Sequence, residues 1–240
     1  MWLHAIDQNA PVVGGEEETR LRQGICRVGA LCYQRGLIAG ADGNISARMS
    51  DGNILVTPRG AMKGLLEPHH LARVDPQGRV LDTGPQPSTE IGIHLVSYAE
   101  RPDVMAVVHA HPPHAVALSI AGIDLTEPVI PEIVVTIGGT PTTPLATPGT
   151  SELPESIRDV VRSSDTLVMR NHGALAVGSN LMDAFKKLDM VEHMARILWL
   201  AHAVGTVEPL PGDVVRKLLG TRKHLGIETK NVLEDRAQRP

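Results

Sequence analysis

The hydrophobic and polar positions in the first quarter of the chain predict a helix followed by a β-hairpin. Between Glu16 and Gly36 apolar residues recur at helical spacing, and Gly36 suits the C-cap of that helix. Apolar and polar residues then alternate from Ile45 to Met49, which is typical of a strand. The dipeptide Asp51-Gly52 is a strong turn signal, and it precedes a second apolar strand at Ile54 to Thr57.

Short strands and helices continue to alternate along the rest of the chain. We expect further strands at residues 72–75, 79–82, 105–109, 133–136, 166–170 and 175–177, and further helices at residues 91–99, 113–121, 151–161 and 180–198. This mixture favours an α/β fold with a mixed or largely antiparallel sheet covered by helices. We expect one domain at residues 16–210, with an N-terminal extension at residues 1–15 and a C-terminal tail at residues 211–240.

The composition of the 240-residue chain argues against some classes of function. Its formal net charge is −4, no basic stripe runs along it, and aromatic residues make up 2% of it. A nucleic-acid-binding protein needs basic residues for phosphates and often aromatic rings for bases, so we expect no nucleic-acid partner. No apolar run reaches the ~18 residues that a membrane span needs, so we expect no membrane partner.

The N-terminus and the cysteines favour a cytoplasmic location. Residues 1–15 lack the basic and apolar stretches of a signal peptide. Cys26 and Cys32 are the only cysteines in the sequence, and their spacing places them on different faces of the first predicted helix. We therefore expect no disulfide between them, and such sparse use of cysteine suits a reducing compartment.

The segment from Val107 to His111 is the strongest sign of chemistry in the sequence. Residues i and i+2 of a strand project to the same face, so His109 and His111 can direct two imidazoles at one ion. Zinc favours imidazole ligands, and catalytic zinc sites commonly combine three protein ligands with an open position. The alternative is an ordinary polar alternation at a sheet edge, and by itself the pair favours a metal only slightly.

His172 and Glu90 are candidates for the remaining ligands. His172 interrupts two apolar strands, so it should lie at a strand end, where functional residues gather. Glu90 lies in the first turn of a helix, where the helix dipole favours a carboxylate. His94 shares the helix face of Glu90, and His114 follows the histidine pair closely. Each of these two could be a ligand or a packing residue. His94 could also contact a metal ligand and orient it without binding the metal itself.

Three short segments rich in glycine or hydroxyl groups suggest an anion-binding site beside the metal. Backbone N–H groups at tight glycine turns and helix starts bind anions, and hydroxyl side chains add donors. Each segment alone is weak evidence, whereas three of them around one metal site are more persuasive. The segments are Gly43-Asn44, Thr57-Pro58-Arg59-Gly60 and Ser88-Thr89.

Together these motifs resemble the class II aldolase/adducin family, the group that includes L-fuculose-phosphate aldolase and L-ribulose-5-phosphate 4-epimerase. The motifs follow the order of the family and cover roughly residues 20–205. None is specific alone, but the set is highly specific. The matching motifs are Gly43-Asn44-Ile45-Ser46, Val56-Thr57-Pro58-Arg59-Gly60, Pro87-Ser88-Thr89-Glu90, Val108-His109-Ala110-His111 and Asn171-His172-Gly173.

The resemblance implies a single three-layer α/β/α domain with a central, mainly antiparallel sheet, assembled as a homotetramer with sites between subunits. It implies one divalent metal ion per chain, zinc first and manganese or cobalt next. The ligands would be three histidines, His109, His111 and His172. Glu90 matches the acid/base residue of the family, which can also ligate the metal, while His94 and His114 fall outside the usual ligand set. The phosphate-binding positions of the family correspond to Gly43, Asn44, Gly60, Ser88 and Thr89.

Two departures from the family pattern bear on the reaction. The phosphate loop often carries a small hydroxyl residue where this chain has Arg59, which could bind phosphate or form a fork with a substrate carboxylate. The aldolases place a catalytic tyrosine in the segment that is here residues 129–133, and by our placement that tyrosine is replaced by Glu132. No tyrosine follows Tyr98 in the sequence.

The function expected from the sequence is that of a divalent-metal-dependent lyase. The leading mechanism is retro-aldol cleavage of a phosphorylated ketose, in which the ion polarises the carbonyl and stabilises the enediolate. Glu90 would move the proton, and Glu132 is a weak candidate for the acid that protonates the departing fragment. The alternative is a metal-dependent decarboxylase of a hydroxy-aromatic or sugar acid, with Arg59 holding the carboxylate. A third hypothesis is a non-catalytic adducin-like binding module. The presence of the metal-ligand set disfavours it.

Overall fold

The computed structural model describes residues 15–233, which form one seven-stranded β-sheet. The strand order is β3-β2-β1-β4-β7-β6-β5, and each neighbouring pair is antiparallel except β5 with β6. The strands are β1 (Asn44–Arg48), β2 (Ile54–Val56), β3 (Ala72–Val74), β4 (Ala106–Ala110), β5 (Thr142–Thr143), β6 (Thr166–Met169) and β7 (Gly173–Gly178). The expected mainly antiparallel sheet is confirmed.

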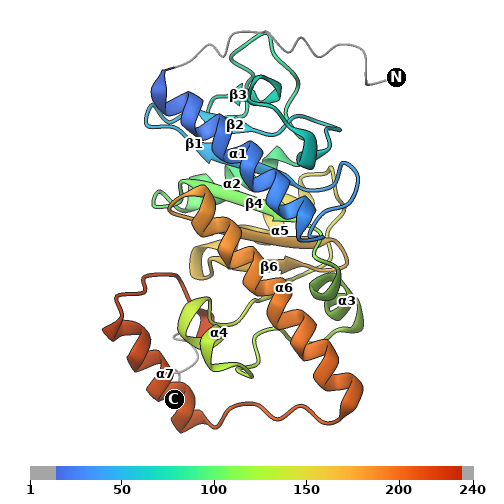
Figure 1. Ribbon diagram of the computed structural model, residues 1–240, viewed down its shortest axis with the longest axis vertical. Coiled ribbons are helices and arrows are strands. Elements are labelled where there is room, and N and C mark those ends of the chain that lie inside the picture. The colour runs from blue at the N-terminus through green and yellow to red at the C-terminus, as the bar shows by residue number, and fades with distance from the viewer. Residues whose placement is uncertain (1–14, 234–240) are drawn as a thin grey trace.

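Helices cover both faces of this sheet (Figure 1). Residues of α1, α3 and α6 join the core on one face, and residues of α2 and α5 join the core on the other. The helices are α1 (Glu16–Gln34), α2 (Ile91–Glu100), α3 (Pro113–Ala121), α4 (Pro131–Thr136), α5 (Glu152–Ser163), α6 (Leu181–Val204) and α7 (Gly212–His224), with short 3-10 helices η1 (Lys63–Leu65) and η2 (Pro68–His70). The expected three-layer α/β/α arrangement is therefore confirmed.

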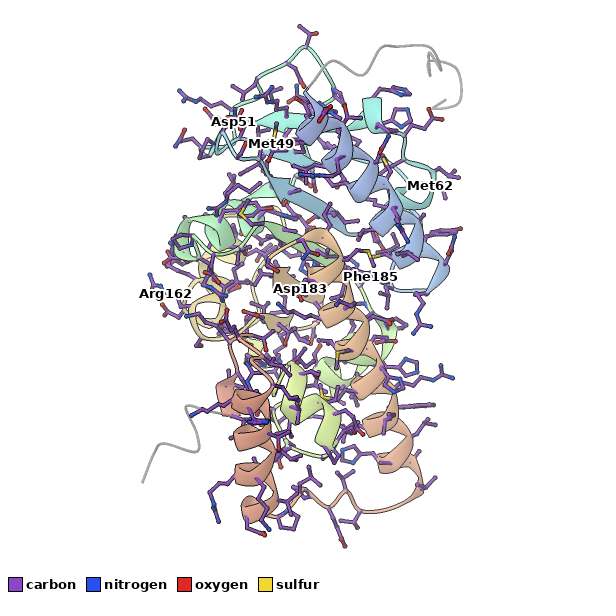
Figure 2. All side chains as sticks on the ribbon, turned by 60° about the vertical axis from the view of Figure 1, so that its left-hand side comes forward. Met49, Asp51, Met62, Arg162, Asp183 and Phe185 are labelled. Atoms are coloured by element: carbon purple, nitrogen blue, oxygen red, sulfur yellow. The ribbon has the colours of Figure 1, made fainter. Side chains whose placement is uncertain are left out.

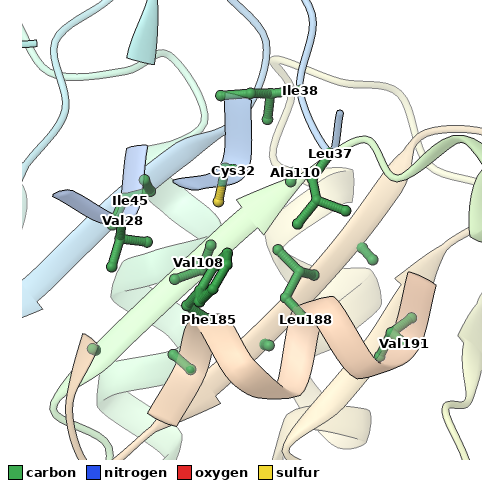
Figure 3. Close-up of a cluster of buried hydrophobic side chains, with 14 of the residues drawn as sticks. Val28, Cys32, Leu37, Ile38, Ile45, Val108, Ala110, Phe185, Leu188 and Val191 are labelled. Carbon is green, nitrogen blue, oxygen red and sulfur yellow. The ribbon is translucent and has the colours of Figure 1, made fainter. Parts of the chain in front are cut away.

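Strand β4 lies in the middle of the sheet and directs its side chains alternately to the two cores. Val108 belongs to the core under α1 and α6, whereas Val107 belongs to the core under α2 and α5. Figure 3 shows Phe185 and Leu188 of α6 beside Val108 in the first of these cores. Because residues 107 and 109 share a face of the strand, His109 lies on the α2 side of the sheet.

Helix α6 is fixed on the sheet at its N-terminal end. The Asn180 side chain accepts a hydrogen bond from the backbone N–H of Asp183 at 2.9 Å, which confirms the predicted helix start. The buried Lys187 ammonium lies 2.8 Å from the Asp183 carboxylate and 3.0 Å from that of Asp165. Figure 2 shows Asp183 and Phe185 in the first turns of this helix, near the centre of the view, with Arg162 to their left. The buried cation is thus fully paired, as burial of a charge requires.

Residues 133–136 differ from the sequence-based expectation, because they form the end of helix α4 rather than a strand. Pro131 occupies the first turn of α4, where its missing N–H and fixed φ favour a helix. A short apolar run cannot by itself distinguish a strand from a buried helix. The expected strand at residues 79–82 is reduced to a single bridge between Val74 and Val80.

The expected C-terminal tail contains a helix that the sequence pattern did not predict. Helix α7 packs against α4 (Figure 1), and Leu219 and Val134 share a small core between them. The N-terminal extension lies outside the described residues apart from Gly15. None of the helices within residues 15–233 is long and apolar enough to cross a membrane.

Cys26 and Cys32 both lie in α1 as free thiols, as expected. Burial raises the pKa of Cys26 to about 11 and that of Cys32 to about 12. Both side chains are therefore protonated at neutral pH, and neither is an activated nucleophile.

Candidate metal centre and adjoining pocket

Four predicted ligands converge at one end of the central strands. His109 is in β4, His111 follows that strand directly, His172 lies in the turn between β6 and β7, and Glu90 occupies the N-cap of α2. One ligand atom from each of the four lies within 4.8 Å of the ligand atoms of the other three. The structure therefore brings together residues that are up to 82 positions apart. Among residues 15–233, this is the only group of His, Cys, Asp or Glu side chains that could hold a metal ion.

The three imidazoles form a nearly equilateral triangle. Their ring centroids are 5.0 Å apart for His109 and His111, 5.1 Å for His109 and His172, and 4.9 Å for His111 and His172. The Nε2 atoms of His109 and His111 are 3.1 Å apart. The antiparallel pairing of β4 with β7 brings the third ring next to the first two, because Ala110 lies opposite Ala174.

Gly173 permits this close approach of the rings. A Cβ atom at position 173 would lie 2.7 Å from the His109 ring, 2.7 Å from the His111 ring and 2.5 Å from the Ala110 carbonyl oxygen. Asn171 has a positive φ of 57°, which turns the chain tightly before His172. The Asn171-His172-Gly173 motif is thus a turn that places one ring and leaves space for two others.

The Glu90 carboxylate joins the histidines from the other side. Its two oxygens lie 3.1 Å from His172 Nε2 and 3.4 Å from His109 Nε2, and one accepts a hydrogen bond from the Asn44 side-chain amide at 2.9 Å. Burial raises the pKa of Glu90, but its contacts with His109 and His172 outweigh burial and lower that pKa well below its ordinary value. The N-terminus of α2 also favours a negative charge here. Glu90 is therefore a carboxylate at neutral pH.

The hydrogen bond of His109 and the pKa of His111 suit metal binding. His109 Nδ1 donates a hydrogen bond to the Ala174 carbonyl oxygen at 2.9 Å, which leaves the Nε2 lone pair facing the cluster. Burial, followed by the charges of His109 and His172, lowers the pKa of His111 to about 3. Neutral imidazoles and an ionised carboxylate are the forms that bind zinc and similar ions, so the donor set fits a divalent cation.

The two further histidines that the sequence left open are outside the cluster. His94 is fully buried on α2, behind Asn44, and its ring nitrogens contact Asn44 and Ser46. His114 Nδ1 lies 2.6 Å from the Glu192 carboxylate, and its ring packs against Trp199. Neither histidine is therefore a ligand in this arrangement.

A cavity of about 210 Å³ opens beside Glu90 and His111. Its wall includes all six residues that the sequence suggested for substrate or phosphate binding, which are Gly43, Asn44, Arg59, Gly60, Ser88 and Thr89. Two loops are held side by side there, because Arg59 N–H donates to the Gln86 carbonyl at 3.0 Å and Ser88 N–H donates to the Thr57 carbonyl at 3.2 Å. Their binding of substrate stays a prediction, but the structure gathers them in one place.

Lys63 and Asp42 also line the cavity, and sequence reasoning missed both. Lys63 is 2% exposed, and its Nζ donates a hydrogen bond to the Ala41 carbonyl oxygen. Burial lowers the pKa of Lys63, while the charges of Asp42 and Glu90 act in the opposite direction. A lysine in a 3-10 helix has no sequence signature, so only the fold reveals this buried cation.

Glu132 lies away from these residues. It is exposed in the first turn of α4, the helix that packs with α7 (Figure 1). Within residues 15–233, no hydrogen bond or ion pair joins its carboxylate to the cluster. The structure gives no support within this chain for Glu132 as the second acid.

Comparison with known proteins identifies the family. The model of the class II aldolase and adducin N-terminal domain matches residues 23–199, the part that carries the cluster and the cavity. The chain belongs to this family. The resemblance seen in the sequence motifs is therefore confirmed.

The relatives of this class II aldolase family member are lyases. The 3-oxo-tetronate 4-phosphate decarboxylase of Escherichia coli strain K12 is 32% identical over 187 residues, which cover 76% of this chain and 88% of that enzyme. The L-fuculose phosphate aldolase of the same strain is 34% identical over 177 residues, which cover 73% of this chain and 74% of that enzyme.

Solved structures of the family confirm the fold. The crystal structure of YgbL from Klebsiella pneumoniae has a TM-score of 0.79 and 31% identity, and the match covers 85% of this chain and 100% of that one. An L-fuculose 1-phosphate aldolase has a TM-score of 0.80 and 26% identity, covering 89% of this chain and 100% of that one.

The close approach at Gly173 gives a test of the cluster that needs no ligand. We expect Gly173→Ala to lower the free energy of unfolding by ~1–3 kcal/mol, because the added methyl group overpacks the rings of His109 and His111. Urea unfolding measures this change. The matched control is Gly220→Ala in α7, where a Cβ atom meets nothing within 4 Å, and stability should stay equal or rise. Equal stability of Gly173→Ala and the wild type would contradict the packing described here.

Proposed function

We propose that this protein is a divalent-metal-dependent decarboxylase of a phosphorylated 3-oxo sugar acid. The observation that carries the proposal is the cavity beside the His/Glu cluster, whose wall holds two cations, Arg59 and Lys63. A substrate with a phosphate and a carboxylate needs two cationic partners, whereas a phosphorylated ketose has one anionic group. Similarity to the 3-oxo-tetronate 4-phosphate decarboxylases supports the same choice.

The two cations differ in position and suit different anionic groups. Arg59 is exposed in the loop beside Gly60, near Ser88 and Thr89 at the start of α2. Hydroxyls, glycine N–H groups and a helix N-terminus together suit a phosphate. Lys63 is buried in the cavity wall that Glu90 and His111 also line, and its charge interacts with those of Asp42 and Glu90. We assign Lys63 to the substrate carboxylate.

The cluster would hold the metal through His109, His111, His172 and Glu90, with zinc as the first choice. When bound, a divalent ion would polarise the substrate carbonyl and stabilise the negative charge that develops on its oxygen. The remaining chemistry belongs to the chain. Lys63 binds the carboxylate until the carbon–carbon bond breaks, and Asn44 orients Glu90 through the 2.9 Å hydrogen bond.

Glu90 is the proton carrier in this proposal. In decarboxylation, the electrons of the broken bond pass to the carbonyl group, carbon dioxide leaves, and the carbon that lost it takes up one proton. Glu90 is ionised at rest, so in each turnover it takes up one proton from the solvent and delivers it to that carbon, and the overall reaction consumes this proton. A carboxylate between two imidazoles and an amide is held in one place, which efficient proton transfer requires.

Retro-aldol cleavage of a phosphorylated ketose is the second candidate, favoured by similarity to L-fuculose phosphate aldolase. It uses the same stabilisation of an enediolate, but it also needs a group that takes the proton from the hydroxyl that becomes the aldehyde carbonyl of the departing fragment. The sequence has no tyrosine after Tyr98, and Glu132 lies outside the cavity wall. Decarboxylation releases carbon dioxide without removing a hydroxyl proton and needs no such group, so it fits the residues present better. Assembly as a homotetramer and a cytoplasmic location remain proposals from the family and the sequence.

The reaction is tested by its product. We expect the zinc- or manganese-loaded protein to release carbon dioxide from 3-oxo-tetronate 4-phosphate, and to release no aldehyde from L-fuculose 1-phosphate. Lys63→Met should lower kcat/KM for the 3-oxo acid ~10–100-fold, because a hydrogen bond to a charged group contributes ~1.5–3 kcal/mol. Lys186→Met, a change at an exposed lysine of α6, should have no effect. Aldehyde formation without carbon dioxide would instead establish the retro-aldol reaction.

The metal is tested by elemental analysis of protein purified without chelator. We expect one divalent ion per chain, and we expect the double variant His109→Ala, His111→Ala to lose it, because only His172 and Glu90 remain. The matched control removes two exposed histidines of α6, His193 and His202, and should keep the ion. Unchanged metal content in the first double variant would refute the assigned ligands.

The role of Glu90 is tested by Glu90→Gln. We expect turnover to fall ~10²–10⁴-fold, because glutamine keeps the shape and an oxygen but carries no proton at neutral pH. Three imidazoles remain, so the metal should stay bound. Glu127→Gln, at an exposed site, serves as the control. If turnover of Glu90→Gln stays within a few-fold of the wild type, Glu90 is not the proton carrier.

A further inference from the structure

A chain of buried polar groups extends behind Glu90, away from the cavity. Tyr98 OH lies 2.7 Å from Ser46 Oγ, and Ser46 Oγ lies 2.6 Å from His94 Nδ1. His94 Nε2 contacts Asn44 Oδ1, and Asn44 Nδ2 donates to a Glu90 oxygen at 2.9 Å. This hydrogen-bonded series therefore connects the sheet and α2 to the Glu90 carboxylate, and Asn44 is its only member that lines the cavity.

The direction of each hydrogen bond follows from the carboxylate. The ionised Glu90 can only accept, so the Asn44 amide must direct its NH₂ group to Glu90 and its oxygen to His94. An amide oxygen can only accept, so His94 Nε2 carries the proton. His94 Nδ1 then accepts from the Ser46 hydroxyl, whose oxygen accepts from Tyr98 OH. All the hydrogen bonds of this series run in one direction, and each donor points toward Glu90.

The surroundings hold this arrangement in place. Asn44 and Ser46 occupy alternate positions of β1 that face α2, and Ser46 and His94 are both 0% exposed. Burial, followed by the charge of His109, lowers the pKa of His94 to about 3, so the ring is neutral and must choose one tautomer. Ile93 and Tyr98 lie in the apolar core on the same side of the sheet, and water has no access to His94.

We propose that His94 is a positioning residue that acts on Glu90 through Asn44. Its Nε2–H group holds the Asn44 amide in the orientation in which the NH₂ group donates to Glu90. Without that donor the amide can turn over, and its oxygen would then face the carboxylate and repel it. The inference rests on the proposed role of Glu90 for its catalytic consequence, but the tautomer and the amide orientation are properties of the protein alone.

The tautomer is tested first, by NMR of the wild-type protein with ¹⁵N-labelled histidine. The His94 resonances are identified by their absence from His94→Gln. We expect a protonated Nε2 and an unprotonated Nδ1 throughout the neutral pH range. A protonated Nδ1, or a doubly protonated ring, would overturn the proposal. This measurement needs no turnover, so it decides the point even if the protein is inactive on the 3-oxo acid, a result that would count against the proposed function alone.

The catalytic consequence is tested with three variants of the metal-loaded protein. His94→Leu removes the donor, and kcat should fall ~10–100-fold with KM and metal content little changed, as is typical for partners that orient site residues. His94→Gln can still donate from its amide and should recover most of the loss. Ser97→Ala removes a different buried hydrogen bond of α2, to the Ile93 carbonyl, and should leave kcat unchanged.

Coupling to Asn44 separates positioning from a general loss of structure. If His94 acts through Asn44, the double variant Asn44→Ala, His94→Leu should lose no more activity than Asn44→Ala alone. Additive losses in the double variant, or equal losses in His94→Gln and His94→Leu, would show that His94 only stabilises the fold. Either result would overturn the proposal.

Discussion

The antiparallel register of β4 with its two neighbours determines where the site residues lie. Pairing with β1 places Asn44 opposite His109, and pairing with β7 places Ala174 opposite Ala110, one residue from Gly173. A slip of one residue would turn His109 to the opposite face of the sheet, because side chains alternate along a strand. The apolar residues of β4, buried on both faces, make such a slip costly. The core that stabilises the sheet therefore also fixes the cluster.

Polar residues on the side of the sheet that α2 covers are explained by the charge of Glu90, which is partly buried. A buried carboxylate tends to become protonated unless donors or positive charge compensate. Here two imidazoles, the Asn44 amide and the N-terminus of α2 all favour the ionised form. The apolar positions of β1 fill one core, and its polar positions Asn44 and Ser46 serve the carboxylate on the other face.

Sequence patterns predicted the parts of this protein whose signals are local. The hairpin around Asp51-Gly52 and the long helix after Asn180 have turn and cap residues at fixed positions, and both formed as expected. The histidine pair was recognisable because a strand places i and i+2 together. Residues 133–136 were predicted wrongly, because Pro131 outweighed a short apolar run. Lys63 could not be predicted, because its place at the cavity depends on contacts between segments distant in sequence. Support of a ligand by His94 was one of the alternatives that the sequence left open, and contacts between β1 and α2 were needed to choose it.

The charges around the cavity link substrate binding to the metal. Before any ion binds, the positive charges of Arg59 and Lys63 are balanced by the negative charges of Asp42 and Glu90. A sugar acid with two anionic groups would then gain little net attraction from the cavity as a whole. A divalent ion on the cluster would change this balance, because imidazole ligands bind an ion without adding negative charge. In the proposed reaction the field at the substrate would then become positive on the side of the carbonyl, and Lys63 would keep the carboxylate apart from Glu90. A ligand set with more carboxylates would weaken that field, so three imidazoles and one carboxylate suit an anionic substrate better than an acidic cluster would.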